Sequence, residues 1–318
     1  MNTPLLSDAA LAADALRRGG LVAFPTETVY GLGADARNAD AVANVFAAKG
    51  RPADNPLIVH IANAADASDL AVVSTTARRL MDAFWPGPLT LVVPLRADAG
   101  LAEAVTAGLG TVGLRVPNLP EARAFLAACG VPVAAPSANR SGRPSPTDAH
   151  AVLLDLDGRI DAVLDGPPAT AGLESTVVDV TQGIPVVLRD GAVTLADLRR
   201  VVPETVRAAR GSELARRSPG TRHRHYAPRT RIVAVEPIAA VPHVPPPAGW
   251  LGLVPPDDPS PFAQIWTFAT VPDYAHALFR TFREADALGL EALVCRLPPD
   301  QSETLAHALR DRILRAAE

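Results

Sequence analysis

The strongest candidates for chemistry are the cations of the sequence Lys49-Gly50-Arg51-Pro52. The chain has 30 basic residues, and Lys49 is the only lysine among them. A lysine kept in a chain that otherwise uses arginine indicates a position that needs a compact, strongly hydrated ammonium, as many phosphate sites do. A basic residue at a helix end could also simply complement the helix dipole. The absence of any second lysine from the sequence favours anion binding.

Two polar segments directly follow predicted strands, where open α/β sheets place their ligand loops. Residues 25–33 read PTETVYGLG, and the two glycines would let the backbone approach a ligand closely. The threonines and the tyrosine of this segment could instead make only local hydrogen bonds. Residues 136–142 read PSANRSG and offer two hydroxyls, a carboxamide and backbone amides. That mixture suits a phosphate or a purine and its ribose.

Three further polar residues, Arg115, Ser175 and Arg189, lie in or beside apolar strand-like runs. A charge buried without a partner is costly, so each arginine needs a counter-charge. An internal salt bridge would supply one, and so would a carboxylate or phosphate of a ligand. The sequence alone leaves both explanations open.

Several common sites are excluded. No Gly-x-x-x-x-Gly-Lys-Ser/Thr phosphate loop occurs, and the residues that follow the glycines at 108, 110 and 113, namely 114–117, are strand-like and do not predict the helix of a dinucleotide site. Cys129 and Cys295 are the only cysteines, which argues against a disulfide framework or a zinc site. The net charge of -4 and the aromatic content of 4% argue against a broad nucleic-acid surface.

An α/β framework must position these residues, because strand-like and helix-like stretches alternate over the first 200 residues. The predicted helices are 7–18, 40–49, 77–83 and 121–129, and the predicted strands are 21–24, 57–61, 89–95, 111–116, 131–135, 162–165, 176–180 and 186–188. The later strands resemble hairpins, so the sheet is expected to be mixed. Beyond residue 210, strands at 232–235, 249–254 and 292–297 and helices at 272–288 and 302–317 predict a second, smaller α/β unit.

Five motifs of the chain resemble those of the threonylcarbamoyl-AMP synthases. The resemblance rests on KGRPADNPLIVHI, WPGPLTLV, PSANRSG, GLESTVVD and SPGTRHRHYAP, which occur in the family's order. It implies a YrdC-like mixed twisted sheet with helices and a smaller C-terminal Rossmann-like α/β domain. The implied domains are a catalytic domain at residues 1–210, an interdomain linker at 211–230 and a C-terminal domain at 231–318. Within the linker, residues 218–228, with their basic residues and Tyr226, are expected to act as a lid over the active site, and an ordinary solvated connector is the alternative.

The resemblance also implies a reaction: L-threonine, bicarbonate and ATP give threonylcarbamoyl-AMP and pyrophosphate, with Mg2+ on the phosphates and no metal-ligating side chain. Lys49 and Arg51 are the implied catalytic residues. The implied ATP site comprises Lys49, Arg51, Asn55, Thr111, Ser137, Asn139, Ser145, Arg189 and Tyr226. The implied threonine pocket comprises Thr26, His60, Arg115 and Ser175, with Arg115 on the amino-acid carboxylate.

Two other functions compete with this one. An RNA-binding module would need the basic, aromatic-rich surface that the composition does not favour. A related carbamoyl-adenylate enzyme of hydrogenase maturation would need zinc-finger regions, which a chain with two cysteines lacks. The expected partner is a downstream tRNA threonylcarbamoyl transferase, with no membrane and no stable nucleic-acid binding. Without a signal-like or membrane-spanning apolar run in the sequence, a cytoplasmic location is expected.

Overall fold

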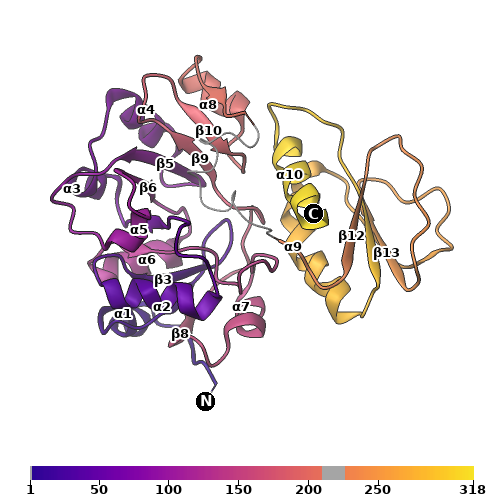
Figure 1. Ribbon diagram of the computed structural model, residues 1–318, viewed down its shortest axis with the longest axis horizontal. Helices are drawn as coiled ribbons and strands as arrows, with labels where there is room; N and C mark the ends of the chain where they lie inside the picture. Colours follow the sequence, from indigo (N-terminus) through magenta and orange to yellow (C-terminus); the bar gives the residue numbers. More distant parts are fainter. Residues whose placement is uncertain (1, 210–225) are drawn as a thin grey trace.

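The computed structural model describes residues 2–209 and 226–318, which form two sheets with their helices (Figure 1). We call the part containing the larger sheet the N-terminal unit and residues 226–318 the C-terminal unit. In the larger sheet the strand order is β1-β8-β2-β3-β7-β4-β6-β5-β9-β10-β11, and in the smaller sheet it is β12-β15-β13-β14. The predicted linker lies mostly outside the described residues, and so does most of the segment expected to act as a lid.

The larger sheet is mixed, as predicted: β2 pairs antiparallel with β3, whereas β4 pairs parallel with β6. Its strands are β1 (Leu5–Leu6), β2 (Val22–Phe24), β3 (Gly31–Asp35), β4 (Ile58–His60), β5 (Leu89–Pro94), β6 (Thr111–Arg115), β7 (Val133–Ala134), β8 (Ala162–Leu164), β9 (Thr176–Asp179), β10 (Val186–Arg189) and β11 (Val206–Arg207). Its helices are α1 (Ala9–Arg17), α2 (Ala39–Lys49), α3 (Ala67–Leu70), α4 (Thr75–Phe84), α5 (Glu103–Thr106), α6 (Pro120–Cys129), α7 (Ala149–Leu156) and α8 (Leu195–Val201).

Helices cover both faces of this sheet. Successive strand residues point to opposite sides, so each face can bury apolar side chains against its own helices. Val22 and Phe24 of β2 pack in one apolar cluster with residues of α1 and α6. Ala23, between them, belongs to a second cluster that includes residues of α2, α4 and α8. The buried strand predicted from the short apolar run at 21–24 is therefore confirmed, with a layer of helices on each side.

Helix α2 delivers Lys49 to the end of this framework. The side chain of Asn38 caps its N-terminus by accepting from the amides of Asp40 and Ala41. Gly50 follows the last turn with φ of 63°, the left-handed conformation that commonly ends a helix. The helix end predicted at Lys49-Gly50 is confirmed.

The segment 25–33 is only partly a loop, since β3 begins at Gly31. Gly31 does border a pocket, as a ligand loop would. Gly33 is not among the residues that border this pocket, and a Cβ there would lie 2.8 Å from Cγ1 of Val133 and 3.1 Å from the ring of Phe24. This glycine makes room for neighbouring side chains of the protein.

The C-terminal unit has an all-parallel sheet of β12 (Arg231–Val235), β13 (Ala248–Gly252), β14 (Phe262–Thr267) and β15 (Ala292–Arg296). Its helices α9 (Val271–Ala287) and α10 (Leu305–Ala317) lie between this sheet and the N-terminal unit (Figure 1). Val29 and Leu173 of the N-terminal unit share one apolar cluster with residues of both helices. The two units are thus joined by a common apolar core.

Among residues 2–209 and 226–318, no helix is long and apolar enough to span a bilayer.

Candidate active site

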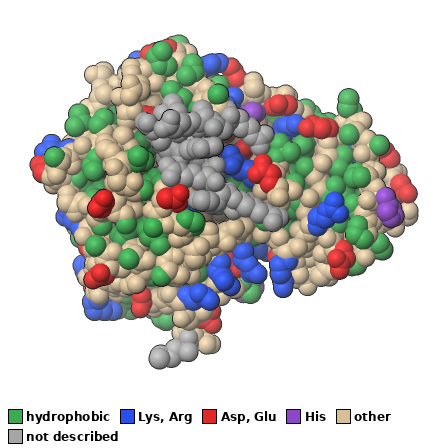
Figure 2. Space-filling model, in the orientation of Figure 1, with side chains coloured by type: hydrophobic (Ala, Val, Ile, Leu, Met, Phe, Trp, Pro, Cys, Tyr) green, Lys and Arg blue, Asp and Glu red, His purple; other side chains and the backbone are tan. Residues whose placement is uncertain are grey.

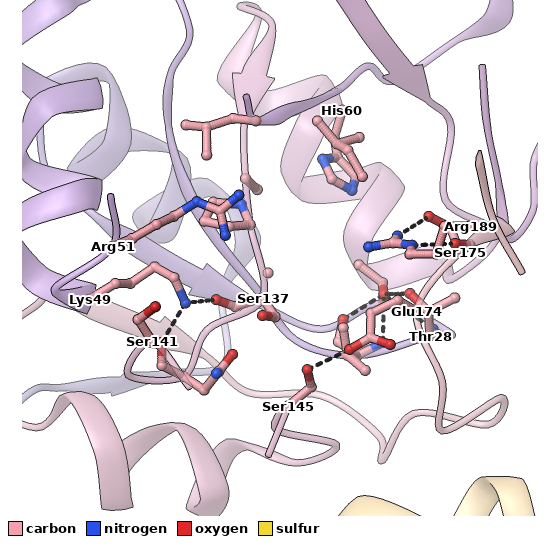
Figure 3. A pocket seen from close by; sticks show the side chains of 18 of the residues that line it. Thr28, Lys49, Arg51, His60, Ser137, Ser141, Ser145, Glu174, Ser175 and Arg189 are labelled. Atoms are coloured by element: carbon pink, nitrogen blue, oxygen red, sulfur yellow. Dashed lines mark hydrogen bonds between the residues drawn. The ribbon is translucent and has the colours of Figure 1, made fainter. Parts of the chain in front are cut away.

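A pocket of about 750 Å³, which includes the part open to solvent, lies at the end of β4 and β6 and gathers most of the predicted site residues. The residues around it are Thr26, Thr28, Val29, Gly31, Lys49, Arg51, Pro56, Leu57, Ile58, His60, Arg115, Ala135, Pro136, Ser137, Asn139, Ser141, Gly142, Arg143, Ser145, Glu174, Ser175, Arg189 and Tyr226. In Figure 3, Lys49 and Arg51 lie on one side, while Ser175, Arg189 and Glu174 lie on the other.

Lys49 is buried, with 3% of its surface exposed. Its Nζ donates to the backbone carbonyls of Ser137 and Asn139, so the helix end and the PSANRSG segment are tied together (Figure 3). The compact ammonium predicted from the sequence is thus held by two carbonyl oxygens of the protein. Burial lowers the pKa of Lys49 well below its ordinary value, and the nearby Arg51 lowers it further. An anion bound here would favour the charged form.

Arg51 is partly buried and lies near other cations. Burial, and then the charge of Arg189, lower the pKa of Arg51 to about 10. Its Nη2 donates to the backbone carbonyls of Asn55 and Pro56 at 3.4 and 3.3 Å. Nε of Arg51 is buried without a hydrogen-bond partner among the described residues, as are both side-chain polar atoms of Asn55. Such orphaned polar atoms are expected where a ligand supplies the missing partners. Asn55 itself does not border the pocket.

Arg115 has internal partners that the sequence could not identify. Its Nη2 lies 2.8 Å from Oε1 of Glu27, an ion pair without the alignment of a hydrogen bond. Its Nη1 donates to Oγ1 of Thr28 at 2.9 Å, and that oxygen lies 2.8 Å from Oγ1 of Thr26. Arg115 can therefore bind a ligand as well as form a salt bridge, because it is paired with Glu27 and still borders the pocket.

His60 is a neutral histidine in this site. Burial, and then the charge of Arg115, lower the pKa of His60 to about 3. Its Nδ1 has no hydrogen-bond partner within the described ranges. Its ring meets that of Phe24 edge-on, with 5.7 Å between centroids. A neutral imidazole in this position can exchange a hydrogen bond with a ligand without adding charge.

Ser175 and Arg189 come together across the pair β9 and β10. Nη2 of Arg189 donates to Oγ of Ser175 at 3.1 Å, and Nε donates to the carbonyl of Ser175 at the same distance. Oγ of Ser175 also lies 2.8 Å from Oγ1 of Thr90. The serine is thus fixed in orientation by a cation that itself borders the pocket.

Asn139 stabilises the loop that it belongs to. Its Nδ2 donates to the carbonyls of Arg140 and Arg143, whereas its Oδ1 is buried without a partner in the described part of the chain. Tyr226 borders the same side and has φ of 68°, an uncommon conformation for a residue other than glycine. Its ring stacks on Phe279 at 5.3 Å. This strained residue is held against α9 by its stacking on Phe279.

Thr111, which was predicted for the ATP site, does not border the pocket. It begins β6, whereas Arg115 at the other end of the same strand borders the pocket. Its backbone register partner is Pro94 of β5. The structure therefore does not bring Thr111 together with the other predicted residues.

Glu174 is a pocket residue that the sequence reasoning missed, although it lies in the GLESTVVD motif. Its Oε1 accepts from Oγ of Ser145 at 2.6 Å (Figure 3), and its Oε2 accepts from Nε of Arg312 at 2.8 Å. The sequence reasoning also missed Arg312. This residue could have been noticed because it is charged and lies among the otherwise apolar positions of α10, such as Leu309 and Ile313, that are buried.

The charges around the pocket favour an anionic ligand. The cations on its wall are Lys49, Arg51, Arg115, Arg143 and Arg189, and the acidic side chain that faces them there is Glu174. Within the described residues, no three His, Cys, Asp or Glu side chains gather as metal ligands. The arrangement can bind phosphates and a carboxylate, and it offers hydroxyls and a neutral imidazole for a small polar ligand.

Comparisons with known families agree with this chemistry. The Sua5_yciO_yrdC family model, described as "Telomere recombination", matches residues 14–191. A second model, described as "Threonylcarbamoyl-AMP synthase, C-terminal domain", matches residues 193–318. Together they account for nearly the whole chain.

Individual proteins are similar as well. The threonylcarbamoyl-AMP synthase of Bacillus subtilis is 49% identical over 230 residues, which cover 71% of this chain and 66% of that protein. That of Pyrococcus abyssi is 46% identical over 231 residues, or 71% of this chain and 67% of that protein. These matches span about two thirds of the relatives' length. The crystal structure of P. abyssi Sua5 complexed with L-threonine is similar over 97% of this chain and 94% of that one, with 36% identity and a TM-score of 0.87.

Proposed function

This chain belongs to the Sua5/YciO/YrdC family, and we propose from this membership that it is a threonylcarbamoyl-AMP synthase. The reaction converts L-threonine, bicarbonate and ATP to threonylcarbamoyl-AMP, pyrophosphate and water. The observation that carries the proposal is a single pocket, rich in cations, bordered by every predicted site residue except Asn55 and Thr111. The similarity to a Sua5 structure that contains L-threonine supports the same reaction.

The pocket supports a division of labour between its two sides. Lys49 and Arg51 would take phosphates of ATP, with Ser137 and Asn139 beside them. Across the pocket, Arg115 would hold the threonine carboxylate, and Thr26, His60 and Ser175 would surround the rest of the amino acid. Tyr226, Arg189 and Ser145 would complete the ATP site, and we retain Asn55 and Thr111 as more distant members of it.

No side chain need act as a nucleophile in this reaction. The threonine amine combines with bicarbonate to give a carbamate and water, a carbamate oxygen attacks the α-phosphorus, and pyrophosphate leaves. Catalysis is then positioning of the reactants together with neutralisation of phosphoryl charge, the proposed catalytic role of Lys49 and Arg51. Burial of the pocket residues would limit the access of water to the labile carbamate.

Mg2+ would enter with ATP. This ion keeps several waters and usually binds to phosphate oxygens with few protein ligands. Among the described pocket residues, the carboxylate Glu174 is already bonded to Ser145 and Arg312. This residue set fits an ion held by the phosphates and by no protein cage, and the bound ion would neutralise phosphate charge.

The expected setting follows from the product. Threonylcarbamoyl-AMP is an activated donor, so a downstream tRNA threonylcarbamoyl transferase would consume it in the cytoplasm. The proposed organisation is a catalytic domain at 1–210, a linker at 211–230 and a C-terminal domain at 231–318. On the face presented in Figure 2, several Lys and Arg side chains gather at the lower centre, and acidic side chains lie scattered elsewhere. The net charge of -4 does not favour RNA binding as the main function.

The test is to incubate the protein with ATP, bicarbonate and L-threonine and to measure pyrophosphate release and the adenylate by mass spectrometry. Release that needs all three substrates supports the proposal. Release without threonine, but with carbamoyl phosphate, would indicate the other carbamoyl-adenylate chemistry. RNA binding without any pyrophosphate release would refute the synthase assignment.

A further inference from the structure

Arg312 is a buried cation at the boundary between the two units. It lies on α10, and its surface is 0% exposed. A buried charge is tolerated only when its partners are well placed. Apart from Asp311 on the same helix, the partners described for it lie outside the C-terminal sheet and its helices: Nε donates to Glu174, and Nη2 donates to the carbonyl of Asp190 at 2.8 Å. Its guanidinium also lies 5.3 Å from the centre of the Tyr226 ring.

Glu174 extends this contact into the pocket wall. One carboxylate oxygen accepts from Arg312, and the other accepts from the hydroxyl of Ser145 at 2.6 Å. Ser145 is 1% exposed and borders the pocket, so its hydroxyl has little room to turn elsewhere. Glu174 also precedes Ser175, which Arg189 holds. One carboxylate thus connects α10 to two residues of the proposed substrate site.

The docking of α9 fixes where Arg312 can lie. Arg283 of α9 donates to the carbonyl of Pro144 and to Oδ2 of Asp155. His276 contacts the carbonyl of Thr170 through Nδ1 at 2.9 Å. These bonds flank the common apolar core and reach the segments just before Ser145 and Glu174. The C-terminal unit therefore holds the backbone just before Ser145 and the segment that leads to Glu174.

We propose that Arg312 is a positioning residue for the synthase reaction: it holds Glu174 ionised and aimed at Ser145, so that the C-terminal unit completes the wall of the substrate pocket. The proposal rests on the proposed function. It gives α10 a role in turnover without placing any of its atoms on the reacting groups.

The electrostatics of Glu174 supply a readout that simple packing would not. Burial raises the pKa of this carboxyl, but the charges of Arg312 and Arg189 and the hydrogen bonds from Ser145 and Arg312 outweigh it, so the pKa lies below its ordinary value. Tyr226 and Asp311 also face this group of charges. Without Arg312, burial would be opposed mainly by Arg189, and the carboxyl would take up a proton at higher pH.

The experiment compares the purified full-length chain with Arg312→Met and Arg312→Lys. Turnover and the KM values for ATP and threonine are measured from acidic to alkaline pH. Arg312→Met should lower kcat by at least about tenfold at neutral pH, because a buried charge-assisted bond is lost. It should also lose further activity as the pH falls, where the wild type does not. Arg312→Lys keeps a cation and should retain most of the turnover and the wild-type pH profile.

Two further variants separate positioning from folding. Arg310→Met is the matched control on the same helix, because the partners described for Arg310, Pro298 and Glu236, both belong to the C-terminal unit; its kinetics should equal those of the wild type. The double variant Glu174→Gln with Arg312→Met leaves no charge in the pair to titrate. It should fold, lack the acidic loss of activity and turn over more slowly than the wild type, since an amide accepts from Ser145 less strongly than a carboxylate.

The outcomes distinguish this inference from the proposed function. If the wild type makes no threonylcarbamoyl-AMP, the proposed function fails, and the positioning role fails with it. If the wild type is active, and a folded Arg312→Met matches its kcat and pH profile, only the positioning role is overturned. Should Arg312→Met not fold, wild-type turnover in the folded double variant would overturn it equally.

Discussion

Gly172 makes the junction of the two units testable with one methyl group. This residue has φ of +71°, and a Cβ on it would lie 2.4 Å from Cα of His276 and 2.5 Å from the carbonyl oxygen of the same residue. Both contacts are with backbone atoms of α9, so no side-chain rotation can relieve them. Gly172→Ala should therefore force the loop and α9 apart.

The magnitude has two parts. Holding alanine in the left-handed region costs about 1–2 kcal/mol. Packing a methyl group where no space exists typically costs about 1–3 kcal/mol more. The free energy of unfolding should thus fall by roughly 2–5 kcal/mol. Urea unfolding followed by circular dichroism measures it.

Gly289→Ala is the matched control. Gly289 has φ of +66° but nothing within 4 Å of its would-be Cβ, so alanine there meets the backbone cost alone, about 1–2 kcal/mol. The excess loss in Gly172→Ala then belongs to the contact between the loop and α9. Equal losses in the two variants would refute the close docking of α9 on this loop.

Three further predictions concern the site. Lys49→Arg should lower turnover by at least about tenfold, roughly 1.4 kcal/mol, because the longer guanidinium cannot occupy the buried place between the Ser137 and Asn139 carbonyls; near-normal pyrophosphate release would show that the lysine is incidental. Valine should be rejected strongly and serine should be a weaker substrate, because valine leaves hydroxyl partners unpaired; equal rates with valine and threonine would contradict the proposed pocket. His60 has its pKa lowered to about 3 by burial and Arg115, so the unfolded chain takes up this proton first as the pH falls. The free energy of unfolding should therefore decrease as the pH falls from about 6.5 towards 3, with the slope expected when the unfolded chain binds up to one more proton than the folded chain. Urea unfolding at several pH values should show that His60→Asn lacks this contribution.

The sequence predicted the framework well where apolar runs were bounded by glycine or proline. The helix that ends at Lys49 and the strands that lead to His60 and Arg115 were recognised for this reason. Strand β3 was missed because its Gly31 and Gly33 have low strand propensity. Both lie against the ring of Phe24, where a Cβ would be crowded, and this contact is visible only in the fold. The edge strands β1 and β11 have two residues each, too short to show a periodicity.

Within the site, motif resemblance could find side chains but not their partners. The pairing of Glu174 with Arg312 joins residues 138 positions apart in the sequence. No local pattern predicts such a contact, because it depends on how α10 packs against the N-terminal unit. Arg115 likewise presents its ion pair with Glu27 only once β6 lies beside the loop after β2. Long-range partners of buried charges are what the fold adds to the sequence.

The buried position of the only lysine makes this protein a natural reporter of its own opening. A reagent selective for ε-amino groups has a single side-chain target, and that target lies inside the pocket with 3% of its surface exposed. Labelling must therefore wait until the pocket opens or the chain unfolds, so its rate measures the free energy of that opening. The same measurement with bound nucleotide gives ligand affinity without any assay of turnover.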